Sequence, residues 1–454
     1  MLIPGAGVLA AVWGGGALAW LLLTWWTARR PAWPFGVSAA TVLVVALVLR
    51  ALPVGLLPVS LSDDVWRYAH DGRTLASGDN PYGASPAEVR AAAVAAGDTA
   101  RVTDLQHVNN AELVTIYQPT SQWVFAVTAT ATGWVAPQAD AATHARALRG
   151  VFAGVDLLIV LLLLVELRRR EASAWWATLY AWSPAVFLET AWAGHQDGLG
   201  VLAVVTTLTL AGRAAGSARA AAAAGVALAL AAAVKPVALP LALPLAWGLR
   251  RQPGRIVWAA GACVLTLVAL YLPFVFMEGG LSGMFETGRS FVTHWRFNGS
   301  VHPLLEEMAK RVGLDRGWGQ EAKRIADGVC LLVLMGTLVV ATLRQKDVWQ
   351  VGLIYMAVMV GLSSTVHPWY LLWAMGLLPV ARAGAAHWGP VTAGVWGAAL
   401  ALPWGYVAWL EVAAGRGYTL PLWVQVGCWV TVAAAVGVGA ALRRKRKAQS
   451  AERK

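Results

Sequence analysis

Carboxylates at helical spacing follow an early apolar run and are the first candidates for chemistry. Only 13% of the chain is charged, yet residues 61–82 contain four aspartates and two arginines. A helix would place Asp64, Tyr68 and Asp71 on one side, with Asp63 and Arg67 as an i,i+4 pair beside them. Such carboxylates can serve as a general base or bind a divalent cation. The alternative is a solvated surface helix with an ordinary ion pair, but the position directly after an expected membrane span favours function.

Gly78-Asp-Asn-Pro-Tyr82 then predicts a turn that ends this helix. Further along the chain, polar residues interrupt apolar runs at four places. These clusters are His195-Gln-Asp197, Lys235-Pro236, Thr293-His-Trp-Arg-Phe-Asn-Gly-Ser300 and Ser364-Thr-Val-His-Pro-Trp-Tyr370.

Each cluster also has a structural explanation. Asp197 could cap the helix that follows it, and Lys235 could extend its charge to the membrane interface. The aromatic residues near Arg296 could belong to an interfacial belt, and a lone histidine such as His367 is more often structural than catalytic. A lysine inside the membrane is costly, however, and is a functional candidate by default.

The composition indicates a polytopic membrane protein. Hydrophobic residues make up 58% of the 454 residues, and the mean hydropathy is +0.58. The net charge of +12 arrives as short basic clusters between apolar runs, which is typical of loops that stay in the cytoplasm rather than of nucleic-acid binding. The three cysteines lie inside apolar runs without metal or redox spacing.

Apolar runs long enough to cross a bilayer predict about 13 transmembrane helices, with a range of about 11 to 13. The expected spans lie near residues 4–27, 36–58, 148–167, 173–190, 197–212, 220–235, 236–249, 255–276, 325–343, 348–366, 369–381, 390–410 and 419–441. The charge rule is satisfied by one arrangement, with the N-terminus outside and the C-terminus in the cytoplasm. It requires that residues 119–136 form a surface helix that does not cross.

The predicted fold is therefore an all-α membrane domain over residues 1–442, followed by a basic cytoplasmic tail over 443–454. Two large extracytoplasmic loops cover residues 60–147 and 277–324. All five polar clusters fall on this outer side, so the sequence predicts one composite site there, in a multi-pass protein of the plasma (inner) membrane.

Asp63-Asp-Val-Trp-Arg-Tyr-Ala-His-Asp-Gly72 and Gly78-Asp-Asn-Pro-Tyr82 resemble the first-loop signature of the GT-C superfamily of polytopic glycosyltransferases. The likeness is to its bacterial branch of polyprenyl-phosphate-dependent mannosyltransferases. Tyr117-Gln-Pro-Thr-Ser-Gln122 is similar to the start of that family's juxtamembrane helix, and the later clusters match in order. His70 stands where the family usually has an aromatic residue, and Gln118 replaces a proline.

The resemblance implies a GT-C-type bundle with extracytoplasmic juxtamembrane helices, and transfer of mannose or a related hexose, with inversion, from a polyprenyl-phosphate donor to a cell-envelope glycan or lipid. Asp63 or Asp64 would be the base, and a divalent ion such as Mg or Mn, if one binds, would use the same pair; the sequence leaves this open. Donor phosphate would be bound by Lys235, His195, Arg296 and His367. Sugar or acceptor contacts would come from Arg67, Tyr68, Asp71, Asn80, Tyr82, Gln196, Asp197 and Asn298. The rival functions are a transporter or lipid flippase, and a non-catalytic scaffold of the cell envelope.

Overall fold

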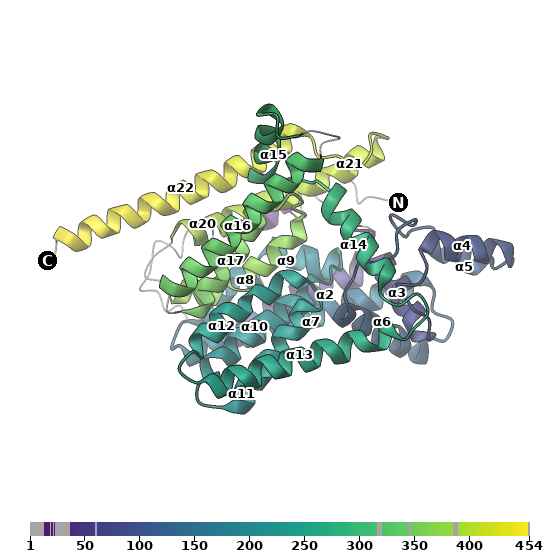
Figure 1. Ribbon diagram of the computed structural model, residues 1–454, viewed down its shortest axis with the longest axis horizontal. Helices are drawn as coiled ribbons and strands as arrows, with labels where there is room; N and C mark the ends of the chain where they lie inside the picture. Colours follow the sequence, from purple (N-terminus) through teal and green to yellow (C-terminus); the bar gives the residue numbers. More distant parts are fainter. Residues whose placement is uncertain are drawn as a thin grey trace. The chain divides into compact units, whose positions relative to one another are not determined.

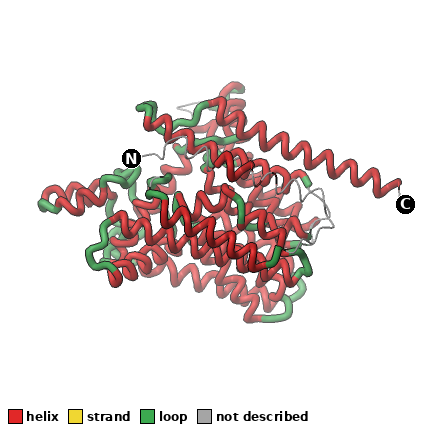
Figure 2. Tube along the Cα trace, turned by 180° about the vertical axis from the view of Figure 1, so that it is seen from behind, coloured by secondary structure: helices red, strands yellow, loops and turns green. Residues whose placement is uncertain are grey.

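The fold is helical throughout the part of the chain that the structure describes. The computed structural model describes residues 13–18, 20, 22, 37–59, 61–315, 320–344, 347–384 and 389–452. Helices joined by loops make up these residues (Figure 2). Within them, β-type pairing is confined to isolated bridges from Thr365 to Phe297 and Asn298. The all-α prediction is confirmed.

The chain divides into two compact units. The first contains residues 1–4, 46–159 and 187–292, and the second contains residues 5–45, 160–186 and 293–454. The boundary falls within four helices: α2 (Ala39–Leu56), α7 (Ala141–Arg169), α9 (Pro184–Phe187) and α14 (Ser282–His294).

The first unit carries the early acidic segment. Its other helices are α3 (Asp64–Ala76), α4 (Pro86–Ala95), α5 (Thr99–Leu105), α6 (Pro119–Val135), η2 (Leu188–Trp192), α10 (Asp197–Ala214), α11 (Ala218–Ala232), η3 (Pro236–Leu241), α12 (Ala242–Gly248) and α13 (Pro253–Val275) (Figure 1). Helix α11 packs against both α10 and α13. Gly225 permits the second contact, because a Cβ there would overlap the carbonyl oxygen of Ala259.

The second unit carries the C-terminal half. Its helices are η1 (Ala174–Ala177), α8 (Thr178–Ala181), α9 (Pro184–Phe187), α15 (Val301–Arg311), α16 (Gln320–Arg344), α17 (Val348–Leu362), η4 (Pro368–Leu371), α18 (Leu372–Met375), α19 (Leu378–Ala383), α20 (Pro390–Ala401), η5 (Leu402–Tyr406), α21 (Val407–Ala413) and α22 (Leu422–Glu452). Here α20 packs along α22, where Gly397 leaves no room for a side chain beside Ala435.

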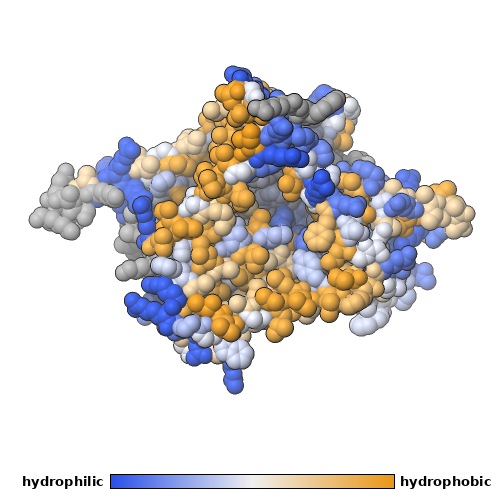
Figure 3. All heavy atoms as spheres, in the orientation of Figure 1, coloured by the Kyte–Doolittle hydropathy of each residue, from blue (hydrophilic) through white to orange (hydrophobic). Residues whose placement is uncertain are grey.

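Among the residues that the structure describes, seven helical segments are long and apolar enough to span a membrane. They are Ala39–Leu56, Ala141–Arg169, Asp197–Ala214, Pro253–Val275, Gln320–Arg344, Pro390–Val412 and Leu422–Arg446. Three shorter apolar helical segments, Ala218–Ala232, Pro236–Gly248 and Val348–Leu362, coincide with further expected spans. The face in Figure 3 shows apolar residues gathered along α13, where Val257, Leu265 and Val268 are exposed. The protein is a membrane protein, while the predicted count of 13 spans stays a prediction.

Two expected spans are broken rather than continuous. Residues 173–190 fold as η1, α8, α9 and the beginning of the π-helical segment η2, and residues 369–381 fold as η4, α18 and α19. Proline explains the breaks, since Pro184 and Pro379 each lack the N–H that a continuing helix requires. The expected span at residues 4–27 lies mostly outside the described residues.

Helix α6 forms at the place where the sequence predicted a surface helix, and α3 packs closely against it. Gly72 makes this contact possible, because a Cβ at that position would lie 2.5 Å from the carbonyl oxygen of Phe125. The close approach lets side chains on one face of α3 reach side chains at the start of α6.

Candidate active site

The two adjacent aspartates stand at the beginning of α3. Asp63 is its N-cap residue and Asp64 its first residue, so both carboxylates lie at the positive end of the helix dipole. One side-chain amide bridges them: Asn109 Nδ2 donates to Asp63 Oδ1 at 2.8 Å and to Asp64 Oδ1 at 2.9 Å. The Asp64 side chain is 16% exposed, which leaves it an opening to substrate.

Arg67 fixes the loop that supplies this amide. It is buried, and its guanidinium donates to the carbonyl oxygens of Asn109, Asn110 and Leu113. The guanidinium therefore holds the 109–113 loop against α3, and its predicted contact with sugar stays a prediction.

Asp64, Tyr68 and Asp71 lie on the face of α3 that packs on α6, as their spacing predicted. Tyr68 stacks on Phe125 with ring centroids 4.7 Å apart. Asp71 is buried and accepts a hydrogen bond of 3.1 Å from Gln122 Nε2. The side chains of this face are thus in contact with the first turns of α6.

Burial raises the pKa of these carboxyl groups. Desolvation, with added repulsion from Asp64, raises the pKa of Asp63 to about 7. Desolvation also raises the pKa of Asp64, against the opposing effect of hydrogen bonds from Asn109 and Tyr117. The pKa of Asp71 is raised to about 6 for the same primary reason. A carboxylate whose pKa lies close to the working pH is suited to general-base catalysis.

Asn80 and Tyr82 anchor the turn that follows α3. The amide nitrogen of Asn80 donates to the carbonyl oxygens of Glu278 and Gly280, both at 2.8 Å. The Tyr82 hydroxyl donates to the carbonyl oxygen of Tyr117 at 2.7 Å. Both side chains are buried and connect three separate segments of the first unit. Their predicted role in binding sugar is untested.

The His195 cluster approaches the aspartates within the same unit. His195 Nδ1 lies 3.6 Å from Asp64 Oδ2, and the ring is fully buried. Gln196 accepts a hydrogen bond from Ser121 at the start of α6. Asp197 begins α10 and accepts one of 2.7 Å from Lys235 Nζ. The structure therefore brings together three of the five predicted clusters.

Lys235 lies in an extended turn between α11 and η3, with its side chain 26% exposed. The carbonyl oxygen of Ala233, two residues earlier, accepts a hydrogen bond from the backbone N–H of Thr120. The only lysine of the first unit's described residues is therefore fixed beside the first turn of α6.

Arg296, Asn298 and His367 belong to the second unit. Arg296 makes a two-pronged ion pair with Glu306 at 3.0 and 2.9 Å. His367 stacks between Phe297 and Trp369, with ring centroids 4.6 and 4.4 Å away. Asn298 has a left-handed backbone, with φ of 48°, and its carbonyl oxygen accepts a hydrogen bond from Trp429. These three residues form a neighbourhood of their own, and their predicted roles stay predictions.

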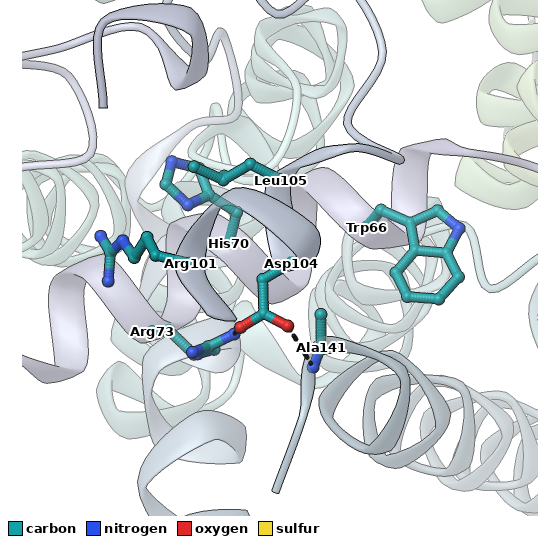
Figure 4. Close-up of a pocket in the computed structure, with 7 residues that line it drawn as sticks. All are labelled: Trp66, His70, Arg73, Arg101, Asp104, Leu105 and Ala141. Atoms are coloured by element: carbon teal, nitrogen blue, oxygen red, sulfur yellow. Dashed lines mark hydrogen bonds and ion pairs between the residues drawn. The ribbon is translucent and has the colours of Figure 1, made fainter. Parts of the chain in front are cut away.

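The small pocket drawn in Figure 4 lies on the opposite face of α3. His70 and Arg73 point into it, and Asp104 joins Arg73 to the backbone N–H of Ala141. Its volume of about 10 Å³ holds no more than a water molecule. Burial and three nearby arginines lower the pKa of His70 to about 3, so this residue stays neutral. His70, where this sequence departs from the family pattern, therefore lies on the face of α3 that points away from Asp64, Tyr68 and Asp71.

Three residues that the sequence reasoning missed support the site. Arg149 is fully buried and donates to the carbonyl oxygens of Pro53 and Leu57, at the end of α2, and of Ala191, in η2. Glu189 is fully buried beside His195. Charged residues inside apolar runs are a signal that could have identified both. Asn109, in a polar loop, carried no such signal.

Among the described residues, no group of three or more His, Cys, Asp or Glu side chains is arranged to hold a metal ion. Asp63 and Asp64 offer two carboxylates, with one oxygen of each accepting a hydrogen bond from Asn109. A divalent ion at this pair stays a prediction.

Comparison with known proteins gives the family. Residues 4–251, more than half of the chain, match the family described as alpha-(1->6)-mannopyranosyltransferase, N-terminal domain. No curated protein matches the sequence. A similar solved structure is the apo oligosaccharyltransferase of Archaeoglobus fulgidus, with a TM-score of 0.43 and 12% identity. That match covers 90% of this chain but 55% of the other, so this chain spans about half the length of that protein. On the sequence match, the chain belongs to the alpha-(1->6)-mannopyranosyltransferase family and is a membrane glycosyltransferase.

Proposed function

We propose that this glycosyltransferase transfers mannose or a related hexose from a polyprenyl-phosphate donor to a glycan or glycolipid acceptor of the cell envelope. The reaction takes place at the extracytoplasmic face and inverts the anomeric carbon. The observation that carries the proposal is the partly open Asp64 carboxylate, whose pKa burial raises, in the same unit as the Lys235 ammonium.

Asp64 is the better candidate for the base. Its Oδ1 accepts a hydrogen bond from Asn109, while its Oδ2 lies toward His195. Asp63 shares the same amide but stands outside the first turn of α3, as its N-cap. In the transfer step, Asp64 takes the proton of the acceptor hydroxyl as that oxygen bonds to C1 of the sugar. The C1–O bond to phosphate breaks, and its electron pair leaves with the lipid phosphate.

Lys235 stabilises the leaving phosphate as a compact positive charge. Its ion pair with Asp197 holds the ammonium in place before the donor arrives. A single displacement at C1 places the acceptor and the leaving phosphate on opposite faces of the sugar, which is why the configuration inverts.

An apolar groove supports a lipid-linked donor. It lies between α6 and α7 with a volume of about 650 Å³, and Trp123, Val127, Ala131 and Ala147 are among its lining residues. The three threonines in its wall donate their hydroxyls elsewhere: Thr128 and Thr132 to carbonyl oxygens of their own helix, and Thr143 to Asp140. The groove therefore offers no unused threonine hydroxyl proton, and its other lining residues are alanines, valines and Trp123.

The groove begins where the polar site ends. Trp123 follows Gln122, whose amide binds Asp71, so the lining changes from polar to apolar within one residue of α6. A lipid whose phosphate lies near Lys235, beside the start of α6, can extend its isoprenoid chain along that helix.

The direct test uses purified protein in lipid nanodiscs, supplied with polyprenyl-phosphate mannose or with a nucleotide sugar, and with chelator or added Mg²⁺ as further arms. We expect transfer from the lipid donor in the wild type and loss of about 10²-fold or more in Asp64→Asn, the contribution of a general base. Transfer from the nucleotide sugar alone, or equal rates in the Asp64→Asn variant, would contradict the proposal.

Filling the groove tests the isoprenoid site. Ala147→Trp should raise KM for a long-chain donor and leave a short-chain analogue unaffected. Val264→Trp, on the exposed apolar face of α13, is the matched control for adding a large ring to a membrane surface. Equal KM values for both variants would argue that the groove holds only bulk lipid.

A further inference from the structure

A buried carboxylate that the transfer step does not use lies behind the site. Glu189 is fully buried in the five-residue π-helix η2. Segments with this wider turn are uncommon and recur at functional sites. A buried carboxylate is expected to be paired or neutral, and its surroundings therefore indicate its role.

The backbone brings His195 back over Glu189. The N–H of His195 donates to the carbonyl oxygen of Glu189 at 2.8 Å. Gly194, between them, has a φ of 74°, and a Cβ there would lie 2.8 Å from Cγ of Arg149. Only glycine suits this turn, which leaves His195 Nε2 3.6 Å from Glu189 Oε2.

The other nitrogen of the same ring faces the proposed base. His195 Nδ1 lies 3.6 Å from Asp64 Oδ2, so the imidazole stands between two carboxylates. Both separations are slightly longer than hydrogen bonds, as is common for catalytic contacts before substrate binds. We infer that Glu189 is a positioning residue that acts through His195, and that the two residues receive from Asp64 the proton taken from the acceptor.

The steps balance as follows. Asp64 gains the acceptor proton while the lipid phosphate leaves with the electron pair of the C1–O bond. The proton then moves from Asp64 Oδ2 to His195 Nδ1, which restores the carboxylate and makes an imidazolium. Glu189 stabilises that cation by accepting its Nε2–H. After the product leaves, the proton returns through Asp64 to water at its exposed edge.

Charged side chains from the neighbouring segments also surround the His195 ring. Asp63 and Arg67 belong to the acidic end of α3, Asp197 pairs with Lys235, and Arg149 lies against Gly194. The next buried carboxylate is separate in function, because Asp156 pairs with Arg50 and accepts from Thr190. Thr190→Val therefore makes a matched control in the same turn of η2.

The inference rests on the proposed function, and its test measures kcat, donor KM and the pH profile of kcat/KM with polyprenyl-phosphate mannose. Glu189→Gln should lower kcat by about a hundredfold, the lower end of what acid–base groups contribute, with donor KM unchanged. Its acidic limb should move to lower pH, because His195 must be neutral to receive the proton and its imidazolium would lose the stabilising charge of Glu189. Loss of that charge with no relay would move the limb in the same direction but would leave kcat near the wild-type value.

Thr190→Val should keep the wild-type profile, and Glu189→Asp should recover part of the lost rate. If Glu189→Gln does not fold, Glu189→Asp alone must lower kcat while its melting temperature stays near that of the wild type. The inference is overturned if the Glu189→Gln profile superimposes on the wild type or if Thr190→Val shifts equally. Loss of transfer in Asp64→Asn together with a normal Glu189→Gln would overturn only this inference, whereas no transfer by the wild type would overturn the proposed function.

Discussion

Replacing Arg149 should loosen both halves of the candidate active site at once. Its guanidinium binds the end of α2, which leads into Asp63 and Asp64, and the segment η2, which leads into His195. Arg149→Met removes three donors from buried carbonyl oxygens. At about 1.5 kcal/mol for each carbonyl left without its donor, the loss is about 4.5 kcal/mol.

Burial of the methionine side chain offsets about 2 kcal/mol of this loss in stability. The net destabilisation is then about 2.5 kcal/mol, a large fraction of the stability of an ordinary domain. Arg149→Lys keeps the charge but not the forked geometry, so its stability should lie between those of the wild type and of Arg149→Met.

The assay pairs thermal unfolding in detergent with steady-state transfer. We expect a lower melting temperature and a kcat reduced by more than donor KM is raised, because the reacting groups, rather than the binding groups, lose their alignment. If Arg149→Met melts and turns over like the wild type, the reasoning that one side chain aligns Asp64 with His195 is refuted.

Three further predictions follow from the same site. The raised pKa of Asp63, about 7, means that ionisation of this carboxyl is unfavourable in the folded protein. Its contribution to stability is therefore greatest when it is protonated and is lost as the pH rises from 3.8, the usual pKa of an aspartate, to about 7. Asp63→Asn should narrow the difference in melting temperature between acidic and neutral pH, and an unchanged difference would contradict this prediction. Gly72→Ala should destabilise the protein, since its Cβ meets Phe125, whereas Gly133→Ala in α6 has open space and should be neutral or slightly stabilising; equal melting temperatures would show that α3 can move away from α6. Asn109→Ala should lower kcat by releasing both carboxylates, and a normal rate would mean that the bridge is dispensable. Asn110→Gly is the neighbouring control, because glycine keeps the left-handed backbone of that residue, whose φ is 43°.

The sequence predicted the parts of the site that depend on periodicity. Helical spacing placed Asp64, Tyr68 and Asp71 on one face, and the structure has them there against α6. A helix at residues 119–136 was also predicted and forms as α6 over Pro119–Val135, while its place at the membrane surface stays a prediction. Local propensity and hydrophobic pattern determine such features.

Contacts between distant segments could not be predicted in this way. Asn109 reaches Asp63 and Asp64 across more than forty residues, and Arg149 binds carbonyl oxygens of two other segments. The break of the expected span at residues 173–190 depends on how prolines and the π-helical turn pack, which periodicity does not encode. The sequence shows His70 as a departure from the family pattern, but only the orientation of α3 shows that this side chain faces α5 and the pocket of Figure 4.

The length of α7 has a consequence for where the chemistry takes place. The helix has 29 residues, and the twenty steps from Arg149 to Arg169 cover about 30 Å, the thickness of the hydrocarbon layer. On the proposed topology, with Arg169 at the cytoplasmic boundary of the bilayer, Arg149 and the residues it aligns would lie at the depth of the opposite lipid headgroups. The phosphate of the proposed donor would then lie at the depth of the reacting groups while its chain stays in the bilayer, and a thicker or thinner membrane should change the transfer rate.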